Sequence, residues 1–204
     1  MSDAPSPPAL VIGLSIHGLA VARALARAGV EVHALEQDPR TPAAKTRYAT
    51  VHFAEGANSD RLGDVLVDLG ADVFQGRKPV LFPTSDNMVR AIAYQWHRLE
   101  ARYLLSWAGC RERVLELQRK DGIARYCEQA GVRHPESVVV SGIDEVQDIA
   151  RGLRFPCVAK PVRPLSAFKA VRLDRPEDLV ALADRYPEDL PYVVQEWVDG
   201  PESE

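Results

Sequence analysis

Residues 9–36, ALVIGLSIHGLAVARALARAGVEVHALE, carry the pattern that decides the fold. The apolar run ALVIGL (9–14) is short and ends at a glycine-bearing turn, which is typical of a buried strand. In GLAVARALARAG (18–29) the apolar residues recur at helical spacing, and Gly29 suits the position just after a helix end. VEVHALE (30–36) is a second apolar strand. A strand, a helix and a strand within about thirty residues form a βαβ unit, which predicts a parallel sheet.

The same alternation continues to about residue 106. ATVHFA (49–54) is a candidate third strand, and the next helix is predicted over 58–70, capped by Asn58 or Ser59 and ended by Gly70. PVLFPTSD (79–86) is a fourth strand that runs into a turn, where Ser85 or Asp86 can cap a long helix. We therefore expect a parallel α/β domain over residues 9–106, after a disordered lead at 1–8.

Beyond residue 106 the pattern changes. Residues 111–132 have a helical pattern with a break near Asp121 and Gly122, and Ser141 is expected to cap a later helix over 143–153. Pro176 suits the first turn of a last helix over 175–186. Short strands are predicted at 137–140, 155–161, 169–173 and 192–198. We expect a small α+β unit over 120–204, joined to the first domain by a linker helix at 107–119.

Composition excludes several classes of protein. The 204 residues are 46% hydrophobic and 26% charged, as in an ordinary soluble globular protein. The net charge of −4, with no Lys/Arg-rich run, argues against a nucleic-acid partner, and no apolar run has the length of a membrane helix. The three cysteines, Cys110, Cys127 and Cys157, lack metal-ligand spacing, so we expect reduced thiols in a cytoplasmic protein.

The turn GLSIHG (13–18) lies where a dinucleotide-binding domain holds its phosphates. The fingerprint G-x-G-x-x-G is absent, because Ser15 stands at the place of the second glycine. Glu36, at the end of the second strand, could imitate the acid that binds a ribose. The alternatives are a Rossmann-type dinucleotide site and a tight structural turn, in which His17 is exposed or hydrogen-bonded.

Two lysines point to an anionic ligand. Lys160, in FPCVAKP (155–161), ends an apolar strand, where an ammonium group is costly to bury unless an anion meets it. Lys120 stands at the head of a helix. Two point charges from different elements can clamp a polyphosphate.

With these lysines and the strand VVQEWV (193–198), the sequence resembles the ATP-grasp superfamily over essentially its whole length. GLAVARALARAGVEVHALEQDP (18–39), TRYA (46–49) and LFPTSDNMVRAIA (81–93) are similar to the Rossmann-like domain before the ATP-grasp module. The similarity is to carboxylate–amine ligases of the D-aspartate-ligase and carbamoyl-phosphate-synthetase-like branch. The second half resembles the first ATP-grasp subdomain. The resemblance implies an ATP-dependent ligase that activates a carboxylate as an acyl phosphate for attack by an amine.

The resemblance also assigns the ATP-binding residues. It places Lys120, Lys160 and Ser166 against the phosphates, although the loop 161–168 lacks the glycines that the family usually has there. Gln195 matches the position that accepts from the adenine amino group, and Glu202 matches the ribose acid. Backbone groups of Glu196 and Val198 would pair with the purine, beside Trp197 at the family's aromatic position.

Substrate contacts are expected after the strand ends of the first domain, where open α/β sheets place their ligands. The partners implied are ATP and a small carboxylate or amine, with a homodimer as one option. The residues expected to contact substrate are Gly13, Ser15, His17, Ser85 and Asp86.

In the family, the carboxylates that hold Mg²⁺ lie in the second subdomain, so we expect them beyond residue 204, with no catalytic residue or metal ligand inside this chain. The chain is interpreted as the N-terminal part of a longer ligase, inactive by itself. The alternatives are a Rossmann-type dinucleotide-binding module and a non-catalytic scaffold.

Overall fold

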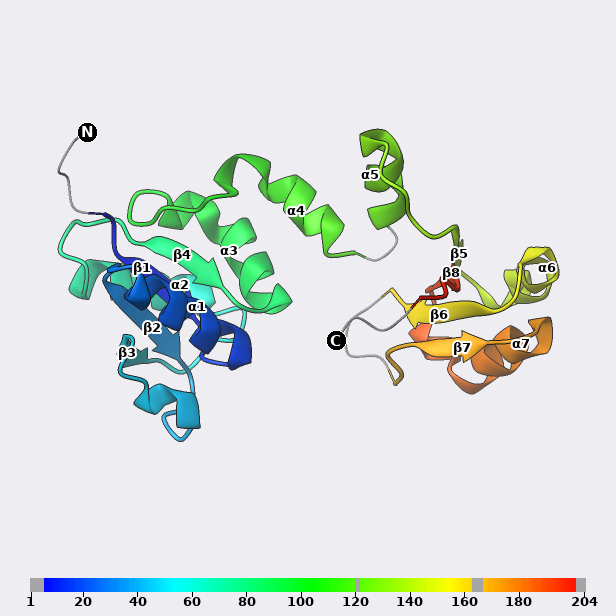
Figure 1. Ribbon diagram of the computed structural model, residues 1–204, viewed down its shortest axis with the longest axis horizontal. Coiled ribbons are helices and arrows are strands. Elements are labelled where there is room, and N and C mark those ends of the chain that lie inside the picture. The colour runs from blue at the N-terminus through cyan, green and yellow to red at the C-terminus, as the bar shows by residue number, and fades with distance from the viewer. Residues whose placement is uncertain (1–5, 120–121, 163–166, 201–204) are drawn as a thin grey trace. The chain divides into compact units, whose positions relative to one another are not determined.

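The computed structural model describes residues 6–119, 122–162 and 167–200, which fall into two compact units, Met1–Leu115 and Glu116–Glu204 (Figure 1). The division lies within the stretch 107–119. Lys120, Ser166, Glu202 and the first five residues of the predicted lead lie outside the described residues. No described helix has the length and apolar character that crossing a membrane would require.

The first unit is built on a parallel sheet of β1 (Ala9–Ile12), β2 (Val32–Glu36), β3 (Thr50–Phe53) and β4 (Val80–Pro83). The strand order is β3-β2-β1-β4, and Ala9 lies beside Val32 on one flank and Val80 on the other. The parallel sheet predicted from the βαβ pattern is therefore confirmed. Because β1 is central and pairs on both sides, all four of its residues are buried.

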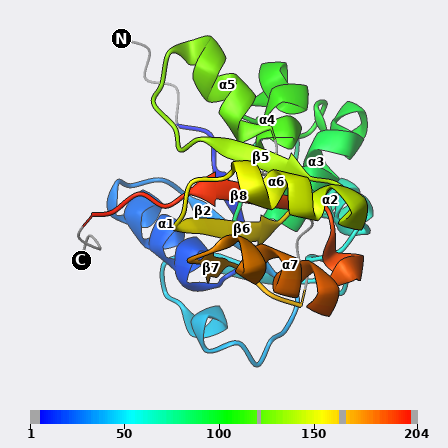
Figure 2. The same cartoon turned by 90° about the vertical axis from the view of Figure 1, so that its right-hand side faces the viewer.

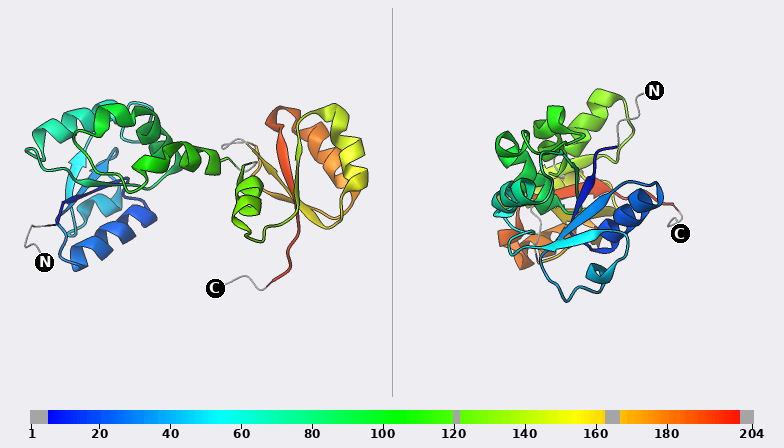
Figure 3. Two further views of the ribbon diagram at one scale, coloured as in Figure 1. Left: turned by 90° about the horizontal axis from the view of Figure 1, so that it is seen from above. Right: turned by 90° about the vertical axis from the view of Figure 1, so that its left-hand side faces the viewer.

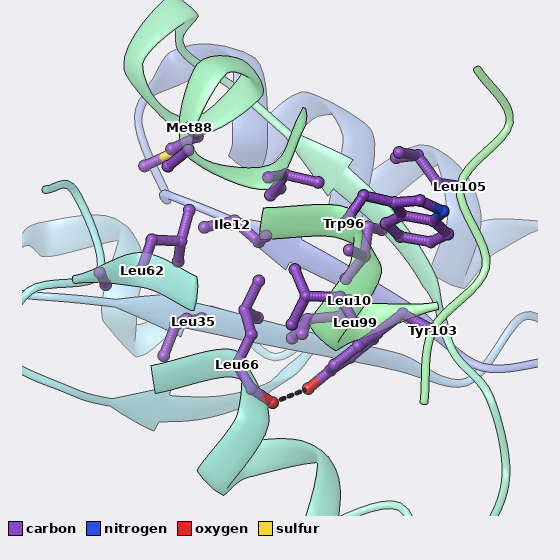
Figure 4. Packing of buried hydrophobic residues seen from close by; sticks show 14 of the residues in the cluster. Leu10, Ile12, Leu35, Leu62, Leu66, Met88, Trp96, Leu99, Tyr103 and Leu105 are labelled. Atoms are coloured by element: carbon purple, nitrogen blue, oxygen red, sulfur yellow. Dashed lines mark hydrogen bonds between the residues drawn. The ribbon is translucent and has the colours of Figure 1, made fainter. Parts of the chain in front are cut away.

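Helices cover both faces of this sheet (Figures 1 and 3). Val11 packs with Ala22 of α1 (Ile16–Arg27) on one face. Leu10 and Ile12 point to the other face, where they pack against α2 (Leu62–Asp72) and α3 (Asp86–Leu99), as Figure 4 shows. The alternation of side chains along β1 thus divides the core between the two helix layers.

Two glycines set how closely α1 approaches the end of β1. Gly13 has a φ of 84°, a left-handed conformation that favours glycine, and a Cβ there would lie 2.7 Å from Thr84 Oγ1. A Cβ on Gly18 would lie 1.8 Å from the carbonyl oxygen of Gly13. The turn 13–18 is therefore closed by backbone packing that side chains would prevent.

The predicted ends of α2 are wrong. The helix begins at Leu62 without a side-chain cap, so neither Asn58 nor Ser59 caps it, and Gly70 lies inside it. Gly70 has a packing role instead: a Cβ there would lie 3.0 Å from Tyr103 Oη. Tyr103 is buried and donates a hydrogen bond of 2.6 Å to the carbonyl oxygen of Leu66 (Figure 4). The glycine thus makes room for a buried tyrosine, a cause that lies outside the helix itself.

A chain of polar groups crosses β2 and β3. His33 is buried, and its ring nitrogens lie 2.9 Å from His52 Nε2 and 2.9 Å from Glu31 Oε1. Arg77 pairs with the same carboxylate and, with His33, lowers the pKa of Glu31 to about 2. Both ring nitrogens of His33 therefore have a hydrogen-bond partner, so this buried side chain has no unsatisfied polar atom.

Two short 3₁₀ helices complete the first unit. The helix η1 (Pro42–Lys45) follows β2, and η2 (Ala108–Cys110) follows α3 and leads into α4 (Arg111–Leu117).

The second unit holds an antiparallel sheet of β5 (Ser137–Val140), β6 (Cys157–Pro161), β7 (Val171–Leu173) and β8 (Tyr192–Glu196), in the order β5-β8-β6-β7. The helices α6 (Val146–Gly152) and α7 (Pro176–Arg185) cover one face of it (Figure 2). Cys157, Ala159 and Val194 point to that face and pack with the helices. The unit also contains α5 (Ile123–Ala130), η3 (Ile143–Glu145) and η4 (Pro187–Asp189).

The predicted cap at Ser141 is wrong. The Glu145 carboxylate accepts hydrogen bonds from the amides of Ser141, at 2.7 Å, and Gly142, at 2.8 Å. The segment therefore starts as η3, and α6 follows from Val146. The acidic side chain reaches back to the amides of Ser141 and Gly142, so this turn is held by a residue inside η3 and not by a serine cap before it.

Substitution of Gly18 by alanine should lower the free energy of unfolding by about 1–3 kcal/mol, because the new methyl group must displace the backbone of Gly13. The control is Gly109→Ala, since a Cβ there meets no atom within 4 Å. Urea denaturation of both variants measures the difference. Equal stability of Gly18→Ala and the unmodified protein would contradict the close packing of this turn.

Candidate functional site

In the first unit, the carboxyl ends of β1 and β4 form an edge where two loops meet. Residues 13–15 lead from β1 into α1, and residues 84–85 lead from β4 into α3. Thr84 Oγ1 donates a hydrogen bond of 2.7 Å to the carbonyl oxygen of Ile12, which ties the loops together. Strands β2 and β3 lie on one side of β1 and β4 on the other, so the chain reverses its winding here. Such a switch point is where open α/β sheets bind ligands. We call it the β1–β4 edge.

The structure brings all five predicted substrate residues to the β1–β4 edge. Ser15, His17 and Asp86 are exposed there. Ser85 is half-buried and caps α3, because its Oγ accepts a hydrogen bond from the Met88 amide at 3.4 Å. Gly13 is pressed against Thr84. Ser85 and Gly13 therefore shape the edge, while the three exposed side chains can reach a ligand.

Glu36, the last residue of β2, forms a hydrogen bond to the backbone at the β1–β4 edge. Its Oε2 accepts a hydrogen bond of 2.7 Å from the amide of Leu14, and its Oε1 accepts one of 2.7 Å from the amide of Gln37. Both carboxylate oxygens thus hold the chain's own backbone. This arrangement favours a structural role for Glu36 over the ribose-binding role that a dinucleotide site would require.

In the second unit, strand alternation divides the sheet into a helix-covered face and a face that carries Val158, Lys160, Val193 and Gln195, here called the lysine face. Lys160 and Gln195 lie on neighbouring strands, and Lys160 Nζ donates a hydrogen bond of 3.0 Å to Gln195 Oε1. Both side chains are half-buried. The structure therefore brings together two residues to which the resemblance assigned different parts of ATP, the phosphates for Lys160 and the adenine for Gln195.

Trp197 lies against an arginine that sequence reasoning missed. The guanidinium carbon of Arg172 is 4.6 Å from the centre of the Trp197 ring, and the indole Nε1 donates to Asp199 at 2.8 Å. Arg172 pairs with Val158 across the β6–β7 ladder, so it lies on the lysine face. In the sequence, Arg172 is marked only by its place in the predicted strand KAVRL (169–173). Which face it shares with Lys160 depends on how β7 pairs with β6, and that register cannot be read from the sequence.

The segment after β8 offers fewer free backbone groups than expected. The amide of Glu196 donates to the carbonyl of Glu136 at 2.8 Å, so this amide does not face a purine. The Glu196 side chain accepts from the amide of Glu136 at 3.3 Å. Val198 is 66% exposed, and within the described residues no backbone partner is found for its amide. Of the two residues whose backbone was expected to pair with a purine, Glu196 therefore has its amide occupied, while the Val198 amide has no backbone partner among the described residues.

Within residues 6–119, 122–162 and 167–200, no group of three or more His, Cys, Asp and Glu side chains is placed to hold a metal ion.

This chain is similar to known proteins in its structure. No family model and no curated protein matches the sequence. A solved N5-carboxyaminoimidazole ribonucleotide synthetase in complex with ADP superimposes with a TM-score of 0.73 at 19% identity, covering 95% of this chain and 48% of that one. The biotin carboxylase domain of the Hydrogenobacter thermophilus 2-oxoglutarate carboxylase, with MgADP and bicarbonate, gives 0.69 at 16% identity, covering 95% and 44%. A phosphoribosylamine–glycine ligase from Thermotoga maritima gives 0.61 at 16%, covering 95% and 44%.

At these identities the likeness is one of fold. The mixed α/β fold of this chain, with its four-stranded parallel sheet, is shared with part of each of these solved enzymes. The chain spans about half the length of the structures that it matches.

Substitution of Glu36 by alanine should lower the free energy of unfolding by about 1–3 kcal/mol, because the amide of buried Leu14 loses its partner. Glu36→Gln keeps one accepting oxygen and should lose less. Glu55→Ala, at an exposed acid of the same unit, is the control and should change stability by less than about 0.5 kcal/mol. Thermal or urea unfolding measures all three. Unchanged stability of Glu36→Ala, together with loss of NADH binding, would restore the ribose-acid interpretation.

Proposed function

We propose that this chain is the nucleotide-binding, N-terminal part of an ATP-dependent ligase that activates a carboxylate as an acyl phosphate for attack by an amine. The second unit is the first ATP-grasp subdomain in this proposal, and the first unit is the Rossmann-like domain before it. The single observation that carries the proposal is Lys160 on the lysine face, next to Gln195, in a fold shared with proteins solved with ADP.

Lys160 is the proposed phosphate ligand. It extends from the rigid strand β6, and without nucleotide its ammonium group is held by the neutral amide of Gln195. A neutral acceptor leaves the positive charge uncompensated, so a phosphate oxygen is a better partner. On nucleotide binding, Lys160 would exchange Gln195 for phosphate and release the amide oxygen toward the adenine amino group. The hydrogen bond between the two residues thus keeps both side chains in place for ATP.

The purine would lie against the segment that follows β8. The Glu196 carbonyl and the Val198 amide supply an acceptor and a donor for its edge. Trp197, stacked with the guanidinium of Arg172, supplies a flat surface beside it. The resemblance adds Lys120 and Ser166 at the phosphates and Glu202 at the ribose hydroxyls. These three residues remain proposals from sequence.

The β1–β4 edge is the proposed substrate site, for a small carboxylate or amine. Ser15, His17 and Asp86 can contact that substrate, and Gly13 and Ser85 shape the loops. Two helices begin at this edge, so a negative group there meets the positive ends of both helix dipoles. The acids that would hold Mg²⁺ during phosphoryl transfer are proposed to lie outside residues 1–204. We propose a cytoplasmic enzyme with reduced thiols, in which a homodimer is one option.

Replacement of Lys160 by alanine should weaken ATP binding about tenfold or more, because a charge-assisted hydrogen bond to phosphate is lost. The control is Arg151→Ala, which also removes one positive charge from the second unit but lies on α6, paired with Asp148. Calorimetric titration with ATP measures the affinities. Equal affinity of the Lys160→Ala variant and the unmodified chain would remove Lys160 from the nucleotide site.

Residues 1–204 alone should show no amine-dependent release of ADP in a coupled assay, even where ATP binds. The proposed reason is that the acyl-phosphate step needs Mg²⁺ ligands that this chain does not supply. The matched measurement is the same assay with a longer protein that includes the following residues. Robust turnover by residues 1–204 would show that this division of the catalytic groups is wrong.

A further inference from the structure

A cavity of about 580 Å³ opens between α1 and the segment that follows β2 in the first unit. Its volume is in the range of small-molecule sites, which are about 300–1,000 Å³. Leu14, Ile16 and Leu19 line it from the side of α1, and Pro42 and Ala43 line it from η1. Ile16 is 87% exposed at its mouth, an apolar side chain left without a partner. We call it the Tyr48 cavity, after a tyrosine of its lining.

Positive charge gathers at one end of the Tyr48 cavity. The guanidinium carbons of Arg23, Arg27 and Arg47 lie 5.7, 6.0 and 5.3 Å from the centre of the Tyr48 ring. Arg47 Nη2 also lies 3.4 Å from Tyr48 Oη, and Lys45 lines the same cavity. Hydrogen bonding to Arg47, and then to Arg27, lowers the pKa of the Tyr48 hydroxyl below its usual value. Arginines from α1 and from the segment before β3 thus lie next to the same tyrosine ring.

The chain itself does not neutralise these cations. In the part of the chain that the structure describes, no carboxylate forms an ion pair with Arg23, Arg27, Lys45 or Arg47, and no acid lines the cavity. Other arginines of the unit do have such partners: Arg77 pairs with Glu31 and Arg98 with Asp64. Three of these exposed cations line the cavity and Arg27 lies beside Tyr48, so an anionic ligand there would relieve their mutual repulsion.

We propose that the Tyr48 cavity binds a small organic phosphate. Its phosphate group lies among Arg23, Lys45 and Arg47, and its apolar or aromatic body lies on Leu14, Ile16 and Pro42. A phosphate monoester carries up to two negative charges and three terminal oxygens, so it can meet three cations at once, whereas a carboxylate offers one charge and two oxygens.

This site belongs to the first unit alone and does not rest on nucleotide binding by the second. It shares Ser15 with the β1–β4 edge and extends away from it, along α1 and over η1. If the chain does act on a carboxylate or an amine, the cavity would hold a phosphate carried by that molecule beside the edge where its reacting group lies.

The test is calorimetric titration of the chain with phenyl phosphate, and with phenol and benzoate as matched probes. Phenyl phosphate should bind, benzoate should bind more weakly, and phenol should not bind measurably. Arg23→Gln and Arg47→Gln should each weaken phenyl phosphate about tenfold or more. Arg98→Gln, on α3 at the opposite face of the sheet, removes the same charge from the same unit and should leave the affinity unchanged.

Equal affinities for phenol and phenyl phosphate would overturn the proposal, as would tighter binding of benzoate or unchanged affinity in both arginine variants. Lys160→Ala separates this site from the proposed function. That variant should weaken ATP and leave phenyl phosphate unaffected, whereas Arg23→Gln should weaken phenyl phosphate. Loss of phenyl phosphate binding in Lys160→Ala would place the probe in the nucleotide site and contradict the Tyr48 cavity.

Discussion

The absence of a side chain at Gly18 is the constraint on which the first unit depends. A Cβ there would overlap the carbonyl oxygen of Gly13, so only glycine lets α1 start directly above the end of β1. Three features follow from that close start. Thr84 donates a hydrogen bond to the same turn. Ser15 and His17 lie at the β1–β4 edge. Arg23 and Arg27, further along α1, lie next to the ring of Tyr48. A motif that looks like an incomplete dinucleotide fingerprint thus acts here as a packing device.

The second unit depends on a different rule, the alternation of side chains along its strands. Apolar residues of β6 and β8 face α6 and α7, and their neighbours in sequence face the other way. Lys160 is therefore directed away from the core by the same pattern that buries Ala159. Its hydrogen bond to the neutral amide of Gln195 satisfies a donor but leaves its charge available. A lysine so placed is suited to an anionic ligand, because no carboxylate of its own strand competes for it.

The two units concentrate positive charge at separate places in an acidic chain. One place is the lysine face, where Lys160 is held by a neutral amide while Arg172 is paired with Asp174, and the other is the Tyr48 cavity with its arginines. Elsewhere most arginine ion pairs are exposed, such as Arg40 with Asp38, and such pairs contribute little to stability. The cations that lack an acidic partner are thus more informative about ligands than the paired ones. Both places suit a phosphate group, but they present it with different surroundings, an antiparallel sheet in one and an apolar cavity in the other.

The sequence by itself determined the strands, the βαβ order and the parallel sheet, because apolar periodicity and glycine breaks act over short distances. It also placed Lys160 and Gln195 on strands and the predicted substrate residues after strand ends. It failed at Asn58, Gly70 and Ser141, because a cap or a helical glycine depends on packing that comes from elsewhere in the chain. Only the tertiary structure decided that Lys160 meets Gln195, that Arg172 covers Trp197 and that Arg23 and Arg47 share Tyr48. These contacts join distant segments through strand register and helix placement, which no local pattern encodes.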